Sequence, residues 1–550
     1  MQKTYNIFLA KPASIFAVAL LTLLMSACGG GKKAPEHTKL IPKTAVLVAR
    51  LDVKQLTSKT ISLDKLASEE NLQQMGASKK EAEKASKTIK KFLDSGIDFL
   101  NNVYIFSDEI SGSSETFGLA FALDNDDKFT KFIKDDAFWK EADGAKKPEF
   151  KEEGKIKFAI FDDKRNIIAW QGKTGVLLSK SNNSTADLKK LFEMKEGETL
   201  LSNASFKEAM GKNHDASVWI DVEKVSALGG VEATVAMGAA GVNNKDTYLT
   251  FGLTFDKGKI NIDADYTGNE EINKINDKIA NSNISSELTK NVPIADPTTG
   301  FSFAINLEGL FKYAQEKGFL DELEGNLKSL GIKADDISKA LTGDGFGVTS
   351  TINFDAKRKD MPVEFVVSLG VKDKKAFEKL IDKINENTGK AITKEGDVYA
   401  APMGMGSMVL KDKAAYITLD SKLKDGIRDG KSDLKGELKD NVGKYASVVY
   451  IGKGFFDAFV KSKAYKRESF GKAFGKDFPF ESIVFKSEKM KNKKSKTELS
   501  ITMSDKNKNA LLTLIDIGKK ISEEQEKQRK KWEKDFSIEV PEDETVLEEK

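Results

Sequence analysis

Few residues of this 550-residue chain could supply a thiol or an imidazole for catalysis or metal binding. There is one cysteine, Cys28, and the two histidines are His37 and His214. A single cysteine excludes an intramolecular disulfide and any zinc site that needs two thiolates. We expect His214 to lie in an exposed polar loop over residues 211–215, and no Gly-x-Ser-x-Gly motif is present. The sequence therefore predicts no catalytic, cofactor-binding or metal-ligating residues.

Two glycine-containing motifs resemble parts of nucleotide-binding loops. Gly172-Lys173-Thr174 looks like the end of a phosphate-binding loop, but Ile167 stands where that loop needs another glycine. The motif also lies between two expected strands, so we predict a hairpin turn there. Residues 343–347 contain three glycines without dinucleotide-binding spacing, and we predict a turn there too.

Two other clusters suggest a cation. Residues 124–127 contain three aspartates, and hard cations such as calcium favour clustered carboxylates. Phe129 stands where a calcium loop needs glycine, so we expect a loop that also caps a helix, with a weak calcium site as the alternative. Met403, Met405 and Met408 could hold Cu(I) through their thioethers, but methionine also fills gaps in a core, which is the interpretation we favour.

The residues before Cys28 form a pattern typical of secreted lipoproteins. Two lysines flank a polar start, an apolar run covers residues 15–24, and small residues directly precede the cysteine. These are the features of a signal peptide, and the run is shorter than the ~20 apolar residues of a membrane-spanning helix. Met25-Ser26-Ala27-Cys28 resembles a bacterial lipobox, so we predict removal of residues 1–27 and lipidation of Cys28, with palmitate among its acyl chains. The alternative is an unmodified cysteine after an ordinary signal.

The segment after Cys28 bears on location. Residues 28–40 begin with the lipidated cysteine and three glycines, which is typical of a flexible tether. Gly29 does not resemble the Asp that retains bacterial lipoproteins in the inner membrane, and the acidic residues of a Bacteroidota surface-export signal are absent. By this resemblance we expect a protein anchored in the outer membrane and facing the periplasm, although the sequence leaves a cell-surface orientation open.

Composition supports a folded protein with no general affinity for nucleic acid. The chain is 39% hydrophobic and 31% charged, and its 88 basic residues nearly balance its 85 acidic ones. That hydrophobic content is enough for real cores, and a net charge of +3 provides no field that would attract a polyanion.

The body of the chain repeats a unit in which an apolar strand leads into a short helix. Asp52, Asp221 and Asn306 follow three of these strands, where a side-chain oxygen can accept hydrogen bonds from the first free amides of a helix. Gly452 follows the fourth strand. The strands are expected at residues 45–52, 216–221, 301–306 and 446–451.

Longer units recur as well. Two strands followed by a helix are expected over residues 103–133 and again over residues 347–384. We therefore predict an α+β protein of two tandem repeated halves, residues 41–288 and 289–525, each an antiparallel sheet with helices on one face. Residues 526–550 are rich in charge and predict a helical extension with an acidic tail.

The order of these features carries a resemblance. The features are the lipobox, a short tether, the lead-in Ile41-Pro42-Lys43-Thr44-Ala45, a strand, and a helix capped by Asp52. Together they resemble a family of large Bacteroidota lipoproteins that is classed only as a domain of unknown function. The resemblance covers most of the chain after residue 27 and implies an envelope location, but no activity, cofactor or partner.

From these observations we expect a non-enzymatic, lipid-anchored cell-envelope protein with a binding or scaffolding role. Its expected contacts are the membrane, through the lipid, and an envelope protein, but not nucleic acid. A cleft between the halves would be a natural binding location. One alternative is a hydrolase of envelope polymers that works through carboxylates, and another is a carrier of an apolar ligand. The ligand and the oligomeric state stay open.

Overall fold

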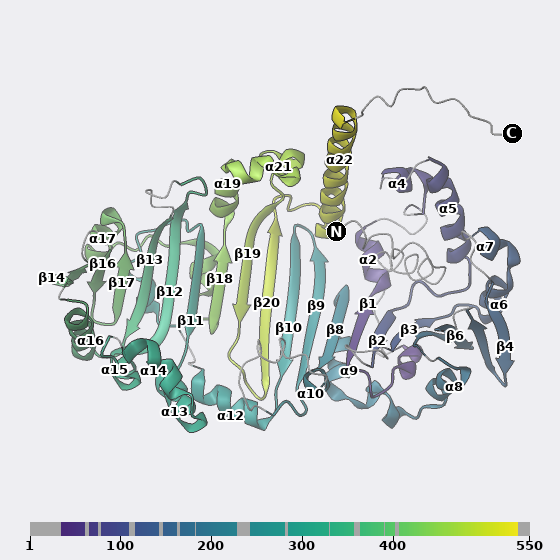
Figure 1. Ribbon diagram of the computed structural model, residues 1–550, viewed down its shortest axis with the longest axis horizontal. Coiled ribbons are helices and arrows are strands. Elements are labelled where there is room, and N and C mark those ends of the chain that lie inside the picture. The colour runs from purple at the N-terminus through teal and green to yellow at the C-terminus, as the bar shows by residue number, and fades with distance from the viewer. Residues whose placement is uncertain are drawn as a thin grey trace, which may run out of the picture.

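The structure of the chain is a computed structural model. It covers residues 35–536 apart from 61–64, 66, 75–78, 109–115, 142–146, 162–164, 182, 228–242, 281–283, 329, 357–362, 390 and 402–405. Within the described residues, twenty strands form one long, open antiparallel sheet with helices packed against it (Figure 1). The predicted α+β class is confirmed at this level.

The order of the strands across the sheet follows from their pairing. From one edge to the centre the strands are β4 (Glu149–Glu153), β5 (Ile156–Ile160), β6 (Asn166–Gln171), β7 (Thr174–Ser179), β3 (Phe117–Ala122), β2 (Val103–Ser107), β1 (Leu47–Leu51), β8 (Ala216–Asp221), β9 (Tyr248–Asp256) and β10 (Lys259–Thr267). From the centre to the other edge they are β20 (Lys494–Met503), β19 (Phe480–Ser487), β18 (Ser447–Ile451), β11 (Thr299–Ala304), β12 (Leu341–Ile352), β13 (Val363–Val371), β17 (Ala414–Thr418), β16 (Ser407–Leu410), β15 (Val398–Ala400) and β14 (Thr393–Glu395).

The two runs of strands meet at β10 and β20. These strands pair from Lys259 opposite Thr502 to Thr267 opposite Lys494, in nine consecutive residue pairs. The expectation that each half has its own sheet is therefore wrong, because all the strands belong to one sheet. Alone, each run would end in a long strand with unpaired backbone N–H and C=O groups, and pairing the two strands satisfies those groups.

Both faces of the sheet are covered at the end that contains β3, β6 and β7. On face A, helices α2 (Val53–Lys59), α5 (Lys79–Leu93), α6 (Asp126–Lys134) and α7 (Asp136–Glu141) contribute to one core. On face B, η1 (Glu36–Leu40), α8 (Thr185–Glu193), η3 (Leu200–Ser202) and α9 (Ala204–Met210) contribute to a second core.

The end that contains β13, β16 and β17 is covered in the same way. Face A lies under α14 (Leu320–Lys328), α15 (Ala334–Ala340) and α16 (Lys374–Asn387). Face B lies under η4 (Ser286–Thr289), α17 (Ser421–Arg428) and α18 (Gly436–Asn441). The prediction of helices on one face only is therefore wrong. Strands such as β6 and β7 are buried along unbroken apolar runs, which require cover on both sides.

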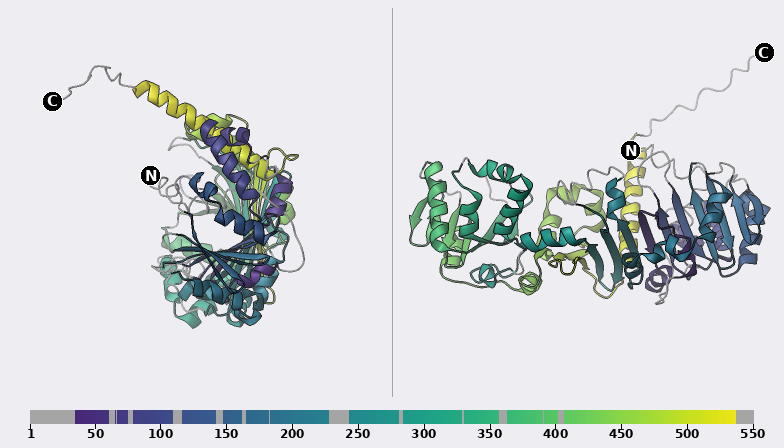
Figure 2. Two further views of the ribbon diagram at one scale, coloured as in Figure 1. Left: turned by 90° about the vertical axis from the view of Figure 1, so that its right-hand side faces the viewer. Right: turned by 90° about the horizontal axis from the view of Figure 1, so that it is seen from below.

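The remaining helices lie near the centre and its edges. One end of α22 (Ala510–Phe536) packs on face A with α2, and the rest of α22 projects from the body (Figures 1 and 2). The others are α4 (Glu69–Gln74), η2 (Glu196–Glu198), α10 (Val222–Ala227), α12 (Glu270–Ile279), α13 (Leu307–Lys317), α19 (Lys453–Lys461), α20 (Lys463–Arg467) and α21 (Ser469–Phe474). The predicted boundary after residue 525 falls inside α22, which is continuous.

Local signals for helix starts are confirmed. The carboxylate of Asp52 accepts a hydrogen bond from the Gln55 amide at 3.1 Å, and Asp221 accepts one from the Lys224 amide at 3.2 Å. Asn306 caps α13 in the same way. The flexible tether predicted over residues 28–40 is wrong for its last residues, because Glu36–Leu40 form η1 and His37 is buried there. Residues 28–34 lie outside the described residues.

Candidate binding surface

Face A is mostly apolar at the centre of the sheet, where the described helices leave much of it open. The hydroxyl side chains of Ser447, Ser487 and Thr497 interrupt it in one row. We call this surface the floor. Its side chains come from the eight strands between β1 and β11, and each is half-buried or exposed. They are Leu47, Ala49, Leu51, Val218, Ile220, Leu249, Phe251, Leu253, Ile262, Ala264, Leu499, Ile501, Ile483, Phe485, Val449, Ile451, Phe301 and Phe303. At the border of the floor, Leu253, Ile262 and Ile501 also pack against the cluster formed with α2 and α22, and Leu51 packs against the core of the covered end.

One row of floor residues crosses six adjacent strands. Each member is the direct cross-strand partner of the next: Phe301, Val449, Phe485, Leu499, Ile262 and Leu253. The first three are 40%, 45% and 37% exposed, respectively. They are three of the eight large apolar residues that stand out as exposed in the described part of the chain. Isolated exposed apolar residues are normal, but a contiguous patch marks an interaction surface.

Two glycines of β12 shape the edge of the floor. A Cβ added to Gly347 would lie 2.5 Å from the Phe301 ring, and one added to Gly345 would lie 2.6 Å from the Phe303 ring. The two rings therefore lie over bare backbone, nearly parallel to each other at an angle of 8°. The turn predicted over residues 343–347 is wrong, because this segment lies within β12. The pairing with β13 is irregular between Leu341 and Gly345, and φ is 93° at Gly343.

Face B of the same central strands is ionic. Lys486 of β19 lies 3.1 Å from the Glu498 carboxylate of β20, and Lys212 forms an ion pair with Asp265 of β10. Burial alone would raise the pKa of Glu498, but hydrogen bonds from Ser500 and Lys486 outweigh it, so its pKa is lowered. Both ion pairs line a groove on face B, which we call the ionic groove.

His214 belongs to this groove rather than to an exposed loop. Its ring occupies the space above Gly252, where an added Cβ would be 2.3 Å away, and Nδ1 lies 3.2 Å from the Thr254 hydroxyl. Burial lowers the pKa of His214, aided by the charges of Arg50 and Lys212 and opposed by Asp263. Gly252 leaves room for the His214 ring because it has no side chain. The sequence alone does not show that these two residues lie together.

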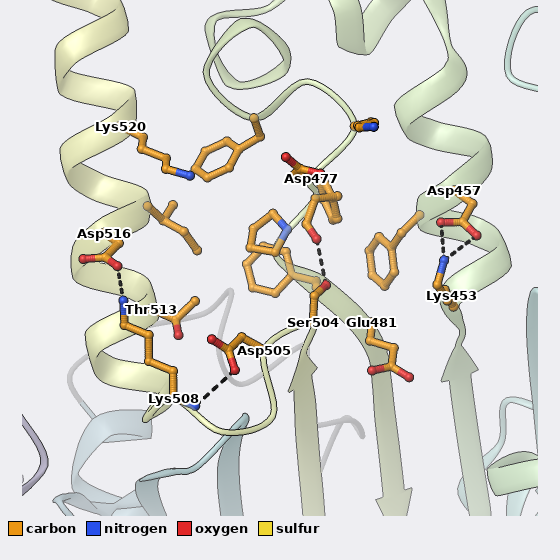
Figure 3. A pocket seen from close by; sticks show the side chains of 17 residues that line it. Lys453, Asp457, Asp477, Glu481, Ser504, Asp505, Lys508, Thr513, Asp516 and Lys520 are labelled. Carbon is orange, nitrogen blue, oxygen red and sulfur yellow. Dashed lines mark hydrogen bonds and ion pairs between the residues drawn. The ribbon is translucent and has the colours of Figure 1, made fainter.

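A further pocket lies between α19 and α22, above the ends of β19 and β20 (Figure 3). Aromatic residues, including Phe456, Phe478 and Phe480, form part of its lining. At its rim Lys453 lies 2.7 Å from Asp457, and Lys508 is paired with Asp516. Because its lining mixes paired charges with phenylalanines, this pocket does not favour one class of ligand. Phe480 also packs in the cluster that covers the end of the floor nearest α22.

The motifs weighed from sequence take structural roles where they are described. Gly172 lies in the turn between β6 and β7, as predicted. Asn125 caps α6, while the Asp126 carboxylate accepts hydrogen bonds from Lys157 and from the Trp170 indole. Among the described residues, no group of three or more His, Cys, Asp or Glu could hold a metal ion.

Several predicted positions lie outside the described residues. They include the lipidation site Cys28 and two of the three methionines considered for copper, Met403 and Met405. Met408 is described, and it packs in the core under α16 beside Tyr399. In the part of the chain that the structure describes, no helix is both long enough and apolar enough to cross a membrane.

The profile of one protein family, described as a domain of unknown function (DUF4836), matches residues 37–436. The chain belongs to this family. The DUF4836 match begins at His37, within η1, and ends at the start of α18, so it includes part of the floor but not β18, β19 or β20. No curated protein and no solved structure shows significant similarity to the chain.

Proposed function

We propose that this protein binds an apolar partner on the floor, without catalysis, while anchored to the bacterial cell envelope by a lipid. The observation that carries this proposal is the row through Phe301, Val449 and Phe485, whose members are neighbours and are all exposed. Exposed apolar area costs about 25 cal/mol for each Å² left in water, so a partner that covers the row gains that free energy.

The anchoring part of the proposal rests on the sequence. The lipobox-like Met25-Ser26-Ala27-Cys28 would place acyl chains on Cys28, as in the Bacteroidota lipoproteins that the chain resembles. An outer-membrane location facing the periplasm follows from Gly29 and the absence of early acidic residues. Metabolic labelling with an alkyne-bearing palmitate, comparing the wild type with Cys28→Ala, tests this part. Equal labelling of both proteins would contradict it.

We also propose that the body arose by duplication of one half. The strand order from β4 to β10 is matched, strand for strand, by the order from β14 to β20. The junction between β10 and β20 would then join equivalent strands, and the floor would lie across that junction.

A hydrolase of envelope polymers is less well supported. Its most suitable carboxylates are those of the ionic groove on face B, where Asp265 and Glu498 are paired with lysines. A general acid needs a raised pKa to hold its proton near neutral pH, whereas the pKa of Glu498 is lowered.

The binding role can be tested without knowing the partner. Because Cys28 is the one native cysteine, a cysteine introduced at position 449 reports on the floor and one at position 100 reports on an exposed site elsewhere. In intact cells we expect maleimide to modify Val449→Cys at least tenfold more slowly than it does in the purified protein. Leu100→Cys should react at similar rates in both. Equal protection of the two sites, or none at position 449, would overturn the proposal.

A further inference from the structure

We propose that the occupant of the floor is the acyl chains of a membrane phospholipid. This inference rests on the proposed function, because it assumes that the floor is the binding surface and names the chemistry of its ligand.

The floor offers an occupant no charge to pair with. On the eight central strands, none of the cross-strand paired positions of face A carries a charged side chain, whereas face B of β10 and β20 carries Asp263, Asp265 and Glu498. Burying an unpaired charge or an unpaired polar group is costly. An uncharged hydrocarbon is therefore the complementary occupant.

Backbone pairing leads to the same conclusion. Each strand between β1 and β11 has a paired neighbour on both sides, so a polypeptide could not add to the sheet there as a new strand. An extended peptide laid on the floor would lose water from its N–H and C=O groups, at a cost of about 1–3 kcal/mol for each group left unpaired. A helix, whose backbone groups are bonded to one another, would not meet this cost. An acyl chain has no such groups to desolvate.

The helices beside the floor do not suit a second copy of the chain. Eight strands at a spacing of ~4.8 Å and four residue rows give a floor of roughly 34 by 20 Å, or about 700 Å², which is near the low end of the area that each partner buries in a standard protein interface. Helices also stand on face A at both ends of the sheet, so two copies placed face to face would meet through those helices before their floors touched.

The test uses the full chain in cells that express it. A benzophenone amino acid placed at position 449 or 485 inserts on irradiation into C–H bonds within its reach. Positions 100 and 323 serve as controls, because Leu100 and Leu323 are 62% and 39% exposed but do not belong to the floor. After purification, the mass of each crosslinked peptide identifies what was captured.

We expect adducts with phospholipid masses at positions 449 and 485, at least tenfold more abundant than at positions 100 and 323. A free fatty acid mass at the floor positions would overturn the assignment to phospholipid. A polypeptide adduct there would overturn the acyl-chain inference while leaving the proposed binding role intact. Adducts that do not differ between floor and control positions would overturn both.

Three substitutions provide an independent measurement. Val449→Lys places a charge on an exposed floor position, and we expect phospholipid that copurifies with the chain to fall at least tenfold. Leu100→Lys adds the same charge off the floor and should leave the copurifying lipid unchanged. Val449→Leu keeps the surface apolar and should retain the lipid. If Val449→Lys retains it as well, the inference is wrong.

Discussion

The ends and the centre of face A carry the same kinds of side chain but differ in what covers them. At the end near α6, Leu119 and Phe121 lie in the core formed with Phe129 and are 2% and 4% exposed. At the centre, Val449 and Phe485 are 45% and 37% exposed. The difference comes from the helices that pack on the strands, since both regions consist of apolar residues on an antiparallel sheet.

The apolar surface has a different role in each of these two regions. At the ends, burial stabilises the fold, and the aromatic side chains of α6 pack against Trp170 of β6 and against Phe138 of α7. At the centre, much of the apolar area stays in water and contributes less to the stability of the isolated chain. An apolar surface that contributes little to folding is available to bind a partner. Four predictions follow from the difference between buried and exposed positions.

The largest effect is expected from Phe129→Ala at the covered end. Phe129 is 0% exposed and its ring packs edge-on against Trp170 at a centroid distance of 5.0 Å. Its removal leaves a cavity, which typically costs about 3–5 kcal/mol. The matched change at the centre, Phe485→Ala, should cost less than about 1 kcal/mol because that ring is already 37% exposed. Urea denaturation measures both, and equal losses would contradict the comparison.

The second effect concerns pH and a group buried at the same end. His37 is 1% exposed, and one of its ring nitrogens lies 2.6 Å from the carbonyl oxygen of Asn102. Burial lowers the pKa of His37 to about 4 from an ordinary value of 6.5, so the folded state binds this proton more weakly than the unfolded state does. Above pH 6.5 the imidazole is neutral in both states and the folded protein is at its most stable with respect to this group. As the pH falls from 6.5 toward 4, the unfolded state takes up the proton first, and the free energy of unfolding decreases.

His37→Gln removes this titration while keeping a hydrogen-bond donor. Between pH 7 and pH 4 the variant should lose less stability than the wild type, by an amount on the order of 3 kcal/mol at most. Denaturation midpoints at a series of pH values measure the difference in slope. Parallel curves for the two proteins would show that His37 is not held neutral by burial.

The third effect compares two glycines of β12, one against fixed backbone and one beside the floor. At Gly343, φ is 93° and an added Cβ would lie 2.0 Å from the Ile305 carbonyl oxygen. At Gly347 the obstacle is the Phe301 ring, which is 40% exposed and can rotate away. We expect Gly343→Ala to cost about 2 kcal/mol and Gly347→Ala less than about 1 kcal/mol. A larger loss for Gly347→Ala would mean that the ring is held as firmly as a core residue.

Features set by near neighbours in the chain were predictable from sequence. The strand at residues 216–221 and the caps at Asp52 and Asn306 depend on local alternation and on one side-chain oxygen each, and all three are confirmed. The single sheet was not predictable, because β10 and β20 are separated by more than two hundred residues and their pattern is the same whether or not they pair with each other.

The floor was missed for a related physical reason. Alternating residues such as Ile260, Ile262 and Ala264 indicate that one side of a strand is apolar, but not which element covers that side. Likewise, the glycines over residues 343–347 suggested a turn, since sequence alone does not show the rings of Phe301 and Phe303 lying over them. In both cases the missing information is a contact between residues far apart in the sequence.

The smallest effect on stability is expected from Val449→Lys. Lysine keeps an aliphatic stem that can lie on the floor while its ammonium group reaches water, and the replaced valine is already 45% exposed. We expect the free energy of unfolding of the purified chain to change by less than about 0.5 kcal/mol. The matched change at the covered end, Leu119→Lys, would bury a charge at a site that is 2% exposed and should prevent stable folding. If Val449→Lys were as damaging as Leu119→Lys, the centre of face A would be part of the core and could not serve as a binding surface.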